Sequence, residues 1–258
     1  MMLEGKVLVA QGGGPTSVIN QSLVGVVLES RKFPQVTRVY GALNGVSGII
    51  NEEFVDLTQE TTHNLEKIAS TPSSALFSTR DKPDEEYCKK IFEVLKIHGI
   101  RYFFYIGGND SADTVRIVNE QATESGYELR AIHIPKTIDN DLYGTDHCPG
   151  FGSAAKYIAT SCMEVAKDAS VYKVGQITII EIMGRHAGWL AGSAALATAF
   201  GSGPDLIYLP EVPFNLEAFL DRVGALYKEK GKVLVAVSEG IHDQDGKLIS
   251  EYGSEGGA

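Results

Sequence analysis

The segment from Pro135 to Asp141 carries a cation, a hydroxyl, an amide and two carboxylates within six positions, just after a strand-like run. Residues two apart in an extended chain share a face, so Thr137, Asp139 and Asp141 are expected to point the same way. A carboxylate in this setting can take the proton from a hydroxyl group, while Lys136 balances phosphoryl charge. A polar turn on the surface is the plainer alternative.

A glycine loop near the N-terminus is a candidate phosphate contact. Gly12, Gly13 and Gly14 follow a valine-rich run at residues 6–11 and precede an amphipathic stretch at residues 17–31. Glycine lets backbone N–H groups approach phosphate oxygens, and the N-terminus of the next helix adds partial positive charge. The spacing is neither that of a Walker A loop nor that of a dinucleotide fingerprint. Taken alone, the loop is equally well explained as a tight structural turn.

A second glycine loop, at residues 107–111, has the same placement and adds polar side chains. Gly108 precedes Asn109, Asp110 and Ser111, which lead into a predicted helix. Amide and carboxylate oxygens suit Mg²⁺ or its water shell beside a polyphosphate, so Asn109 and Asp110 are the candidate metal ligands. The alternative is that Asp110 and Ser111 only cap the helix.

Two arginines complete the set of candidates. Met183, Gly184 and Arg185 follow another strand-like run, where arginine offers several donors to a phosphate and glycine lets the backbone approach a ligand. Taken alone, Met183 is expected to fill the core, and His186 is an ordinary polar group at a helix start. Arg80 lies in a polar loop, where a solvated charge is the default expectation.

The elements that position these loops alternate along the chain. Strands are expected at residues 6–11, 36–43, 101–106, 129–134, 174–182, 205–209 and 232–238, and helices at 17–31, 84–98, 111–125, 152–167, 186–200 and 216–230. This order predicts an α/β fold with mostly parallel sheets covered by helices on both faces. Ligands of such sheets collect beyond the carboxyl ends of the strands, where the four loops lie. A boundary near residue 138 would place two loops on each side of a cleft.

Composition limits the classes of function. The 258 residues have 43% hydrophobic and 22% charged content and a net charge of -10, which argues against general affinity for nucleic acid. The N-terminus lacks the features of a signal peptide, and no apolar run is long enough to span a bilayer. Cys88, Cys148 and Cys162 have neither paired nor metal-ligand spacing, so reduced thiols and a cytoplasmic location are expected.

The loops, taken in this order, resemble the phosphofructokinase family over nearly the whole chain. The sequences Pro-Lys-Thr-Ile-Asp-Asn-Asp at 135–141 and Met-Gly-Arg at 183–185 are the most specific part of the match. The resemblance implies a two-lobed fold of three-layer α/β/α type. It also implies that residues 1–137 form the domain for the phosphate donor and residues 138–258 the domain for the sugar phosphate.

The resemblance assigns three catalytic residues. Asp139 matches the general base on the sugar 1-hydroxyl, Arg80 matches the arginine that reaches the transferred phosphoryl group, and Lys136 stabilises the same charge. The other implied positions are Gly12, Gly13, Gly108, Asp110 and Ser111 for the donor, Thr137, Asp141, Met183, Gly184, Arg185 and Glu239 for the sugar phosphate, and Asn109 and Asp110 for the metal.

Two positions bear on the identity of the donor. Family members that use ATP typically have glycine where Asp110 and Lys136 stand. A carboxylate at position 110 fills and charges the space beside the nucleotide α-phosphate, which disfavours ATP. The lysine adds charge for compact pyrophosphate, so both positions point to the pyrophosphate-using type.

Three departures from the family pattern accompany this resemblance. Asn109 stands where an aspartate is common, so metal binding is expected to be weaker or to rely on Asp110 and Asp141. Gln176 stands where many members have an arginine that contacts sugar phosphate across a subunit boundary. The family continues past residue 258, so the second domain is expected to be incomplete at its C-terminus.

The leading hypothesis is reversible, Mg²⁺-dependent phosphoryl transfer from pyrophosphate to the 1-hydroxyl of fructose 6-phosphate. The alternatives are an ATP-dependent 6-phosphofructokinase and a noncatalytic sugar-phosphate-binding subunit. The resemblance implies a homodimer or homotetramer, with no nucleic-acid or membrane partner.

Overall fold

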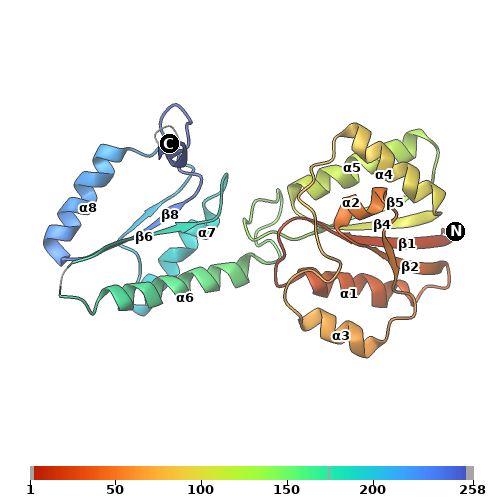
Figure 1. The fold of residues 1–258 in the computed structure, drawn as a ribbon, viewed down its shortest axis with the longest axis horizontal. Coiled ribbons are helices and arrows are strands. Elements are labelled where there is room, and N and C mark those ends of the chain that lie inside the picture. The colour runs from red at the N-terminus through yellow and green to blue at the C-terminus, as the bar shows by residue number, and fades with distance from the viewer. Residues whose placement is uncertain (1–2, 174, 254–258) are drawn as a thin grey trace. The chain divides into compact units, whose positions relative to one another are not determined.

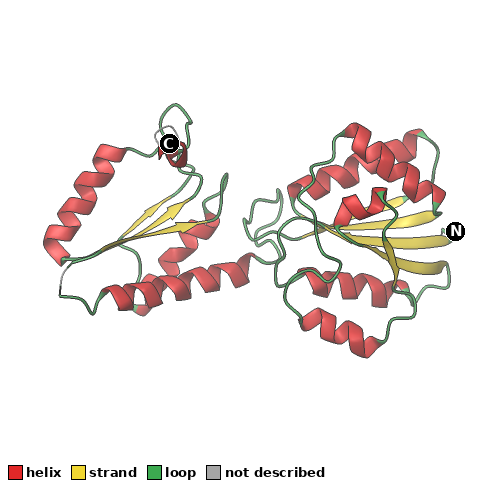
Figure 2. Ribbon diagram, in the orientation of Figure 1, coloured by secondary structure: helices red, strands yellow, loops and turns green. Residues whose placement is uncertain are grey.

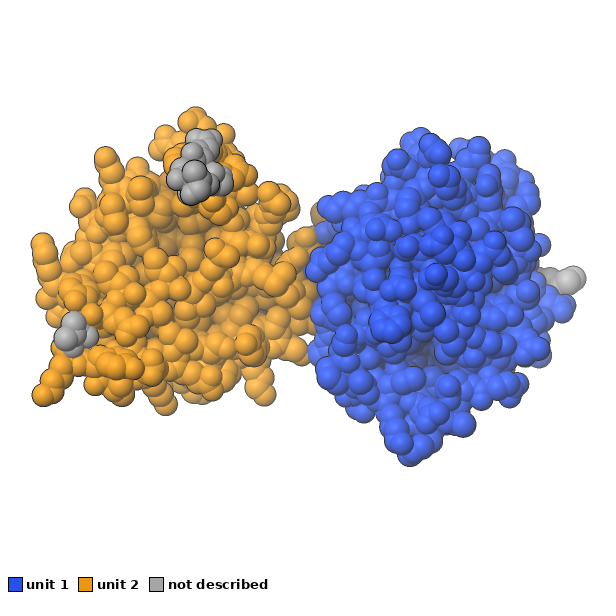
Figure 3. Space-filling view, in the orientation of Figure 1, with its two compact units in different colours: residues 1–137 blue, residues 138–258 orange. Residues whose placement is uncertain are grey.

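The computed structural model describes residues 3–173 and 175–253, and the chain divides into unit 1, residues 1–137, and unit 2, residues 138–258 (Figure 3). No helix within the described residues combines the length and apolar character needed to cross a membrane. The expected alternation of strands and helices is present in both units (Figure 2).

Unit 1 contains a five-stranded sheet in the order β3-β2-β1-β4-β5 (Figure 1). Its strands are β1 (Gly5–Gln11), β2 (Val36–Ala42), β3 (Phe54–Asp56), β4 (Ile100–Gly107) and β5 (Arg130–Pro135). All neighbouring strands are parallel except β2 and β3, which pair antiparallel. The loops that follow β1, β4 and β5 therefore begin at the same edge of the sheet, as the sequence predicted.

Helices cover both faces of this sheet because side chains alternate along the strands. The helices are α1 (Ile19–Ser30), α2 (Gly45–Ile50), α3 (Thr62–Ser70), α4 (Glu85–Ile97) and α5 (Asn109–Glu124). Leu8 and Ala10 of β1 pack in one core cluster with α2, α4 and α5. Val7 and Val9 pack in the other cluster with α1 and α3. Full burial of one such leucine or valine stabilises the fold by roughly 1.5–3 kcal/mol.

Unit 2 contains a three-stranded parallel sheet in the order β6-β8-β7. Its elements are α6 (Phe151–Ala169), β6 (Ile177–Ile182), α7 (Trp189–Ser193), the 3-10 helix η1 (Ala194–Phe200), β7 (Leu206–Tyr208), α8 (Leu216–Lys230), β8 (Val233–Ser238) and the 3-10 helix η2 (Ile249–Gly253). Ala236 packs in a cluster with α6, α7 and η1, whereas Val233 and Val235 pack in a cluster with α8. Helices thus cover both sheet faces here too.

The structure corrects several sequence-based boundaries. The helix expected at residues 186–200 begins only at Trp189, after Gly188, and consists of α7 followed by η1. The run at 174–182 was expected to be a long buried strand, but β6 is the edge strand of its sheet. Ile177 and Ile179 are 49% and 56% exposed. Residue 174 lies outside the described residues.

Three elements of unit 1 were not predicted at all. The helix α3 has nine residues, of which Leu65 is buried and Ile68 and Ala69 are partly buried against the same core cluster. The helix α2 has six residues, two of them glycine, and β3 has three residues. Such short segments find their stability in contacts with the neighbouring elements rather than in local propensity.

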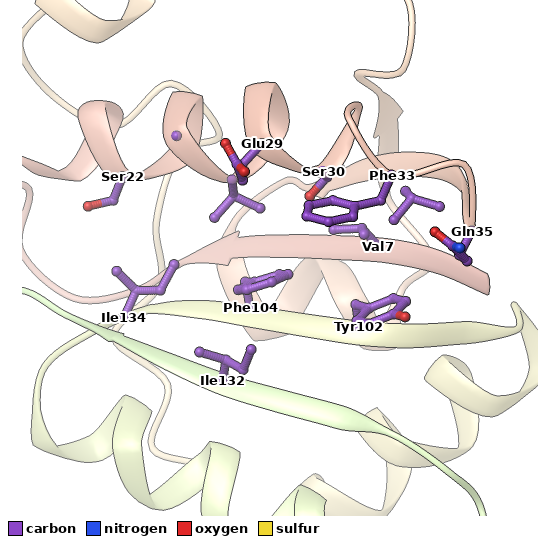
Figure 4. A pocket seen from close by; sticks show the side chains of 13 residues that line it. Val7, Ser22, Glu29, Ser30, Phe33, Gln35, Tyr102, Phe104, Ile132 and Ile134 are labelled. Carbon is purple, nitrogen blue, oxygen red and sulfur yellow. The ribbon is translucent and has the colours of Figure 1, made fainter. Parts of the chain in front are cut away.

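An apolar groove of about 510 Å³ lies on the face of the unit 1 sheet beside α1 (Figure 4). Phe104 and Ile132 of the sheet face it, and Ile132 is 43% exposed. None of the candidate site residues lines this groove, so it is separate from the loops at the carboxyl ends of the strands.

Candidate active site

The loop after β1 brings two cationic side chains against its glycines. A Cβ placed on Gly13 would lie 2.9 Å from Lys136 Nζ, and a Cβ on Gly14 would lie 3.1 Å from Arg80 Nη2. Gly13 also has a positive φ of 73°, which favours glycine. The structure therefore brings together Lys136, Arg80 and this loop, which were separate candidates in the sequence.

The two cations differ in exposure. Lys136 is only 4% exposed, and its backbone N–H donates to the Gly107 carbonyl at 3.0 Å. Arg80 is exposed, as its loop predicted. A lysine and an arginine that meet at one loop offer positive charge and several donors to a compact anion.

The amides of the first two glycines in this loop have partners within the protein. The N–H of Gly12 donates to the Ile106 carbonyl at 2.9 Å, and the N–H of Gly13 donates to the Thr79 carbonyl at 3.0 Å. The helix α1 begins only at Ile19, so its N-terminus does not follow directly on the loop. These two amides therefore have carbonyl partners within the protein, and the assignment of Gly12 and Gly13 to the donor site stays a prediction. The glycines instead make room for side chains.

The loop after β4 provides the helix N-terminus. Gly108 is the N-cap of α5, and no side chain caps this helix. The reading in which Asp110 or Ser111 serves only as a side-chain cap is therefore wrong. Because the first N–H groups of a helix have no partner within the helix, an uncapped N-terminus favours anion binding. Asp110 is exposed, and one of its carboxylate oxygens lies 3.3 Å from Lys82 Nζ.

The buried side chain of Tyr105 contacts both glycine loops, at Gly12 and at Ser111. Its side chain is 2% exposed, and a Cβ on Gly12 would lie 2.4 Å from its hydroxyl oxygen. Burial raises the pKa of Tyr105 to about 12, although a hydrogen bond with the Ser111 side chain acts in the opposite direction. Ser111 is itself buried, so its hydroxyl serves as a support within the loop. From the sequence, Tyr105 was expected only to be part of a strand.

His133 of β5 links its strand to the second glycine loop. Its Nε2 lies 2.8 Å from the Gly107 carbonyl oxygen. Burial lowers the pKa of His133, and the charge of Lys136 acts in the same direction, while hydrogen bonds to the backbone of Gly107 and Gly108 oppose the shift. The imidazole is therefore neutral in the folded protein near neutral pH, where Nε2–H donates to Gly107.

This shift predicts a pH dependence of folding. The folded pKa of His133 lies below the unfolded value of about 6.5, so the unfolded chain binds its proton first as the pH falls. The contribution to stability is full above pH of about 6.5 and decreases as the pH falls through that value. Chemical denaturation across this range is expected to show a decline that His133→Gln reduces and that His63→Gln, in exposed helix α3, leaves unchanged. An unchanged decline in His133→Gln would contradict the assignment.

The candidate metal ligands stand at the start of α5. Asn109 and Asp110 offer one amide and one carboxylate, and Asp110 is exposed. Within the described residues, no three histidine, cysteine, aspartate or glutamate side chains gather into a metal site. This donor set fits Mg²⁺ that is held mainly by the oxygens of a polyphosphate, with one or two protein ligands and waters completing the shell.

In unit 2, Asn140 fixes the loop that carries the two candidate carboxylates. Asn140 is 6% exposed and has a left-handed backbone with a φ of 57°. Its Nδ2 donates to the Asp146 carbonyl at 3.1 Å, and its Oδ1 accepts from the Cys148 N–H at 2.7 Å. Asp139 is half-buried and Asp141 is exposed. The side chain of Asn140 therefore holds the turn at this segment through two hydrogen bonds, as a polar turn would require. The aspartates on either side of it differ in exposure.

The loops after β6 and β8 are clamped together. Gly184, with a φ of 127°, donates its N–H to Glu239 Oε1 at 3.1 Å, and its carbonyl accepts from Ser238 Oγ at 2.5 Å. Arg185 and Met183 are exposed beside this contact, so Met183 does not fill the core. The structure therefore joins the Met-Gly-Arg and Ser-Glu-Gly sequences into one cluster within unit 2.

Gly240 allows the loops after β6 and β8 to approach each other closely. This role could not be predicted from the sequence. A Cβ on Gly240 would lie 2.0 Å from the Arg185 carbonyl oxygen. Gly240→Ala is therefore expected to lower the free energy of unfolding by about 1–3 kcal/mol, because backbone must move. Gly224→Ala is the matched control, since Gly224 lies in α8 with open space around it and should gain up to about 1 kcal/mol. Equal effects of the two substitutions in urea denaturation would refute the role of Gly240.

A cavity of about 1220 Å³ also lies within unit 2, beside α6 and η1. Asn140 and Asp146 line it, whereas none of the predicted site residues does.

Comparisons with known proteins identify the family. The sequence model of the family described as "Phosphofructokinase" matches residues 6–256. The chain is 59% identical over 249 residues to the "Pyrophosphate--fructose 6-phosphate 1-phosphotransferase" of Rhodospirillum rubrum, covering 96% of this chain and 61% of that protein. The chain thus spans about three fifths of the length of this curated relative.

Solved structures show the same fold. A "Pyrophosphate-dependent phosphofructokinase" from Nitrosospira multiformis is 39% identical, with a TM-score of 0.84, over 98% of this chain and 66% of that chain. The enzyme of the same description from Marinobacter aquaeolei is 42% identical, with a TM-score of 0.82, over 93% of this chain and 62% of that chain. These likenesses confirm the expected α/β fold, and with the matched loops they show that the chain belongs to the phosphofructokinase family.

Proposed function

We propose that this chain belongs to an enzyme that transfers a phosphoryl group from pyrophosphate to the 1-hydroxyl of fructose 6-phosphate, reversibly and with Mg²⁺. The observation that carries the proposal is the pair of cations at one loop, with Lys136 Nζ beside Gly13 and Arg80 Nη2 beside Gly14. Two cations at one glycine loop match a small, highly charged donor. The family and the printed names of the relatives support the same reaction.

In this mechanism Asp139 is the general base. Its carboxylate takes the proton of the sugar 1-hydroxyl as the new O–P bond forms and the bond to the leaving phosphate breaks. Asp139 follows Lys136 by three residues, so the chain itself limits the separation of their Cα atoms to about 11 Å. Proton transfer by such a positioned base contributes about 10²–10⁴-fold to a rate.

Lys136 and Arg80 stabilise the charge on the transferred group and hold the donor in line. Asn109 and Asp110 would hold Mg²⁺ together with pyrophosphate, and the ion would supply positive charge that offsets the charge of the phosphate oxygens. Asp110 also places a carboxylate at the start of α5, where it disfavours the α-phosphate of ATP. Gly12, Gly13, Gly108 and Ser111 shape the donor site.

The residues of unit 2 bind the sugar phosphate in this proposal. Arg185 grips the 6-phosphate, and the cluster that joins Gly184 to Glu239 fixes the backbone around it. Further sugar-phosphate contacts come from Thr137, Asp141 and Met183. We place the reaction in the cytoplasm, in keeping with three free cysteines, and expect a homodimer or homotetramer.

A donor-exchange assay tests the proposal. The chain, and a chimera completed with the rest of the Rhodospirillum rubrum relative, are compared with pyrophosphate and with ATP at equal Mg²⁺. Turnover with pyrophosphate and little with ATP is expected, and the Asp110→Gly, Lys136→Gly double variant should shift the ratio toward ATP. Robust activity with ATP alone in the chimera would establish the ATP-dependent alternative. Binding of fructose 6-phosphate without turnover by either donor would establish a noncatalytic subunit.

A further inference from the structure

A buried amide stands beside the first glycine loop and is not part of the chemistry assigned above. Gln11, the last residue of β1, is 0% exposed. Its Nε2 donates to the Ile19 carbonyl at 3.2 Å and to Asn20 Oδ1 at 3.1 Å. Its Oε1 accepts from Ser74 Oγ at 2.7 Å and from the Leu76 N–H at 2.9 Å. Gln11 thus joins β1, the start of α1 and the segment after α3.

Asn20 adds a second amide to the same segment. Asn20 is 2% exposed, its Nδ2 donates to the Thr71 carbonyl at 2.9 Å, and its Oδ1 accepts from the Ala75 N–H at 2.9 Å. Together Gln11 and Asn20 make four hydrogen bonds to residues 71–76. Buried polar groups that are satisfied in this way specify one backbone arrangement, because each partner left alone would be costly.

The backbone of this segment requires such support. Ser73 and Phe77 have left-handed backbones, with φ values of 74° and 59°, although neither is glycine. Each such residue costs on the order of 1 kcal/mol, and the surrounding contacts must compensate. Phe77 is 61% exposed, so packing of its own side chain does not explain its conformation.

The segment held by the two amides leads directly to Arg80. Ser78 Oγ donates to the Gly13 carbonyl at 2.6 Å, and the Gly13 N–H donates to the Thr79 carbonyl at 3.0 Å. The next residue, Arg80, has its Nη2 3.1 Å from the Cβ position of Gly14. Hydrogen bonds therefore anchor this segment at Ser74 and Leu76 and again at Ser78 and Thr79, the residue before Arg80.

We infer that Gln11 and Asn20 are positioning residues for Arg80, which they hold at the glycine loop before the donor binds. The inference rests on the proposed function, in which Arg80 contacts the transferred phosphoryl group. Setting this backbone in advance removes an ordering cost from donor binding. If these residues only stabilised unit 1, substituting them would affect donor binding no more than substituting any other core residue.

The test is a double-variant cycle between Gln11 and Arg80. Gln11→Met keeps the length of the side chain and removes its hydrogen bonds. Affinity for Mg²⁺-pyrophosphate, measured by calorimetry, is expected to fall about tenfold in Gln11→Met and not to fall further when Arg80→Ala is already present. Gln121→Met, which removes one hydrogen bond to the Glu85 carbonyl, is the matched control and should leave the affinity unchanged. Equal losses with and without Arg80 would overturn the inference.

Hydrogen exchange separates this inference from the proposed function. In Gln11→Met, the amides of Ala75, Leu76 and Gly13 are expected to exchange faster, while those of β4 stay protected. If neither the unmodified chain nor the completed chimera binds pyrophosphate, the proposed function is wrong. If exchange at these three amides is unchanged in Gln11→Met, the positioning role of Gln11 is wrong. If Gln11→Met does not fold, Ser74→Ala is the second variant. It removes the hydroxyl that contacts both Gln11 Oε1 and the Phe77 carbonyl, and it should weaken binding by about two- to fivefold only when Arg80 is present.

Discussion

Asp139→Asn is expected to reduce turnover of fructose 6-phosphate with pyrophosphate by about 10²–10⁴-fold, while affinities for both substrates change no more than a few-fold. Asparagine is close to aspartate in size, but its amide cannot take up the proton of the sugar hydroxyl. Asn140 holds the adjacent backbone through Asp146 and Cys148, so the loop should keep its conformation in the variant.

The measurement is initial rate in the donor-exchange assay, together with calorimetry for each substrate. Asp113→Asn is the matched control, because Asp113 is an exposed residue of α5 whose partner is Arg116. Its turnover should equal that of the unmodified protein. Full turnover in Asp139→Asn would remove Asp139 from the role of general base, and loss of substrate binding would assign it a structural role instead.

Lys136→Met is expected to reduce turnover with pyrophosphate by about 10²–10³-fold, the cost typical of losing one group that stabilises developing charge. Methionine fills much of the same buried volume without the ammonium group. Affinity for Mg²⁺-pyrophosphate should fall as well, since Lys136 Nζ lies at the loop of Gly13. The salt dependence of binding should become weaker, because one cation is lost.

Lys96→Met, at an exposed position near the end of α4, is the matched control and should leave binding and turnover unchanged. Lys136→Arg restores the charge, but its wider planar group has to fit where a Cβ on Gly13 would already be only 2.9 Å from the ammonium. We therefore expect Lys136→Arg to recover only part of the activity. Unaltered pyrophosphate affinity in Lys136→Met would exclude Lys136 from the donor site.

The sequence predicted the architecture well because the spacing of apolar residues indicates strands and helices, and the order of these elements indicates the type of sheet. The runs that became β1, β4, β5 and β8 are rich in β-branched or aromatic residues, and the helices between them have apolar stripes. Helix α3 was missed because it is short and has a single buried residue, Leu65, with Ile68 and Ala69 only partly buried against the core. The stretch at 186–200 was predicted as one helix because the apolar pattern does not distinguish α7 from η1.

The candidate site was predictable only as a set of loops. The types of Lys136, Arg80 and Asp139 indicate their chemistry, but which of them meet depends on contacts distant in the chain. The glycine loop illustrates this limit, since the amides of Gly12 and Gly13 bind carbonyls rather than facing outward. Gln11 and Tyr105 gave no signal, because a polar or aromatic residue at the end of a strand is ordinary until its partners are known.

The contact between Gly13 and Lys136 also constrains how such a site can change over generations. While a lysine occupies position 136, any side chain at position 13 meets its ammonium group and an unfavourable backbone angle of 73°. Loss of the lysine would remove the contact but not the backbone angle, and the flexible end of the lysine can itself move aside. Selection for glycine at position 13 is thus set mainly by the backbone and is expected to persist whichever residue occupies position 136.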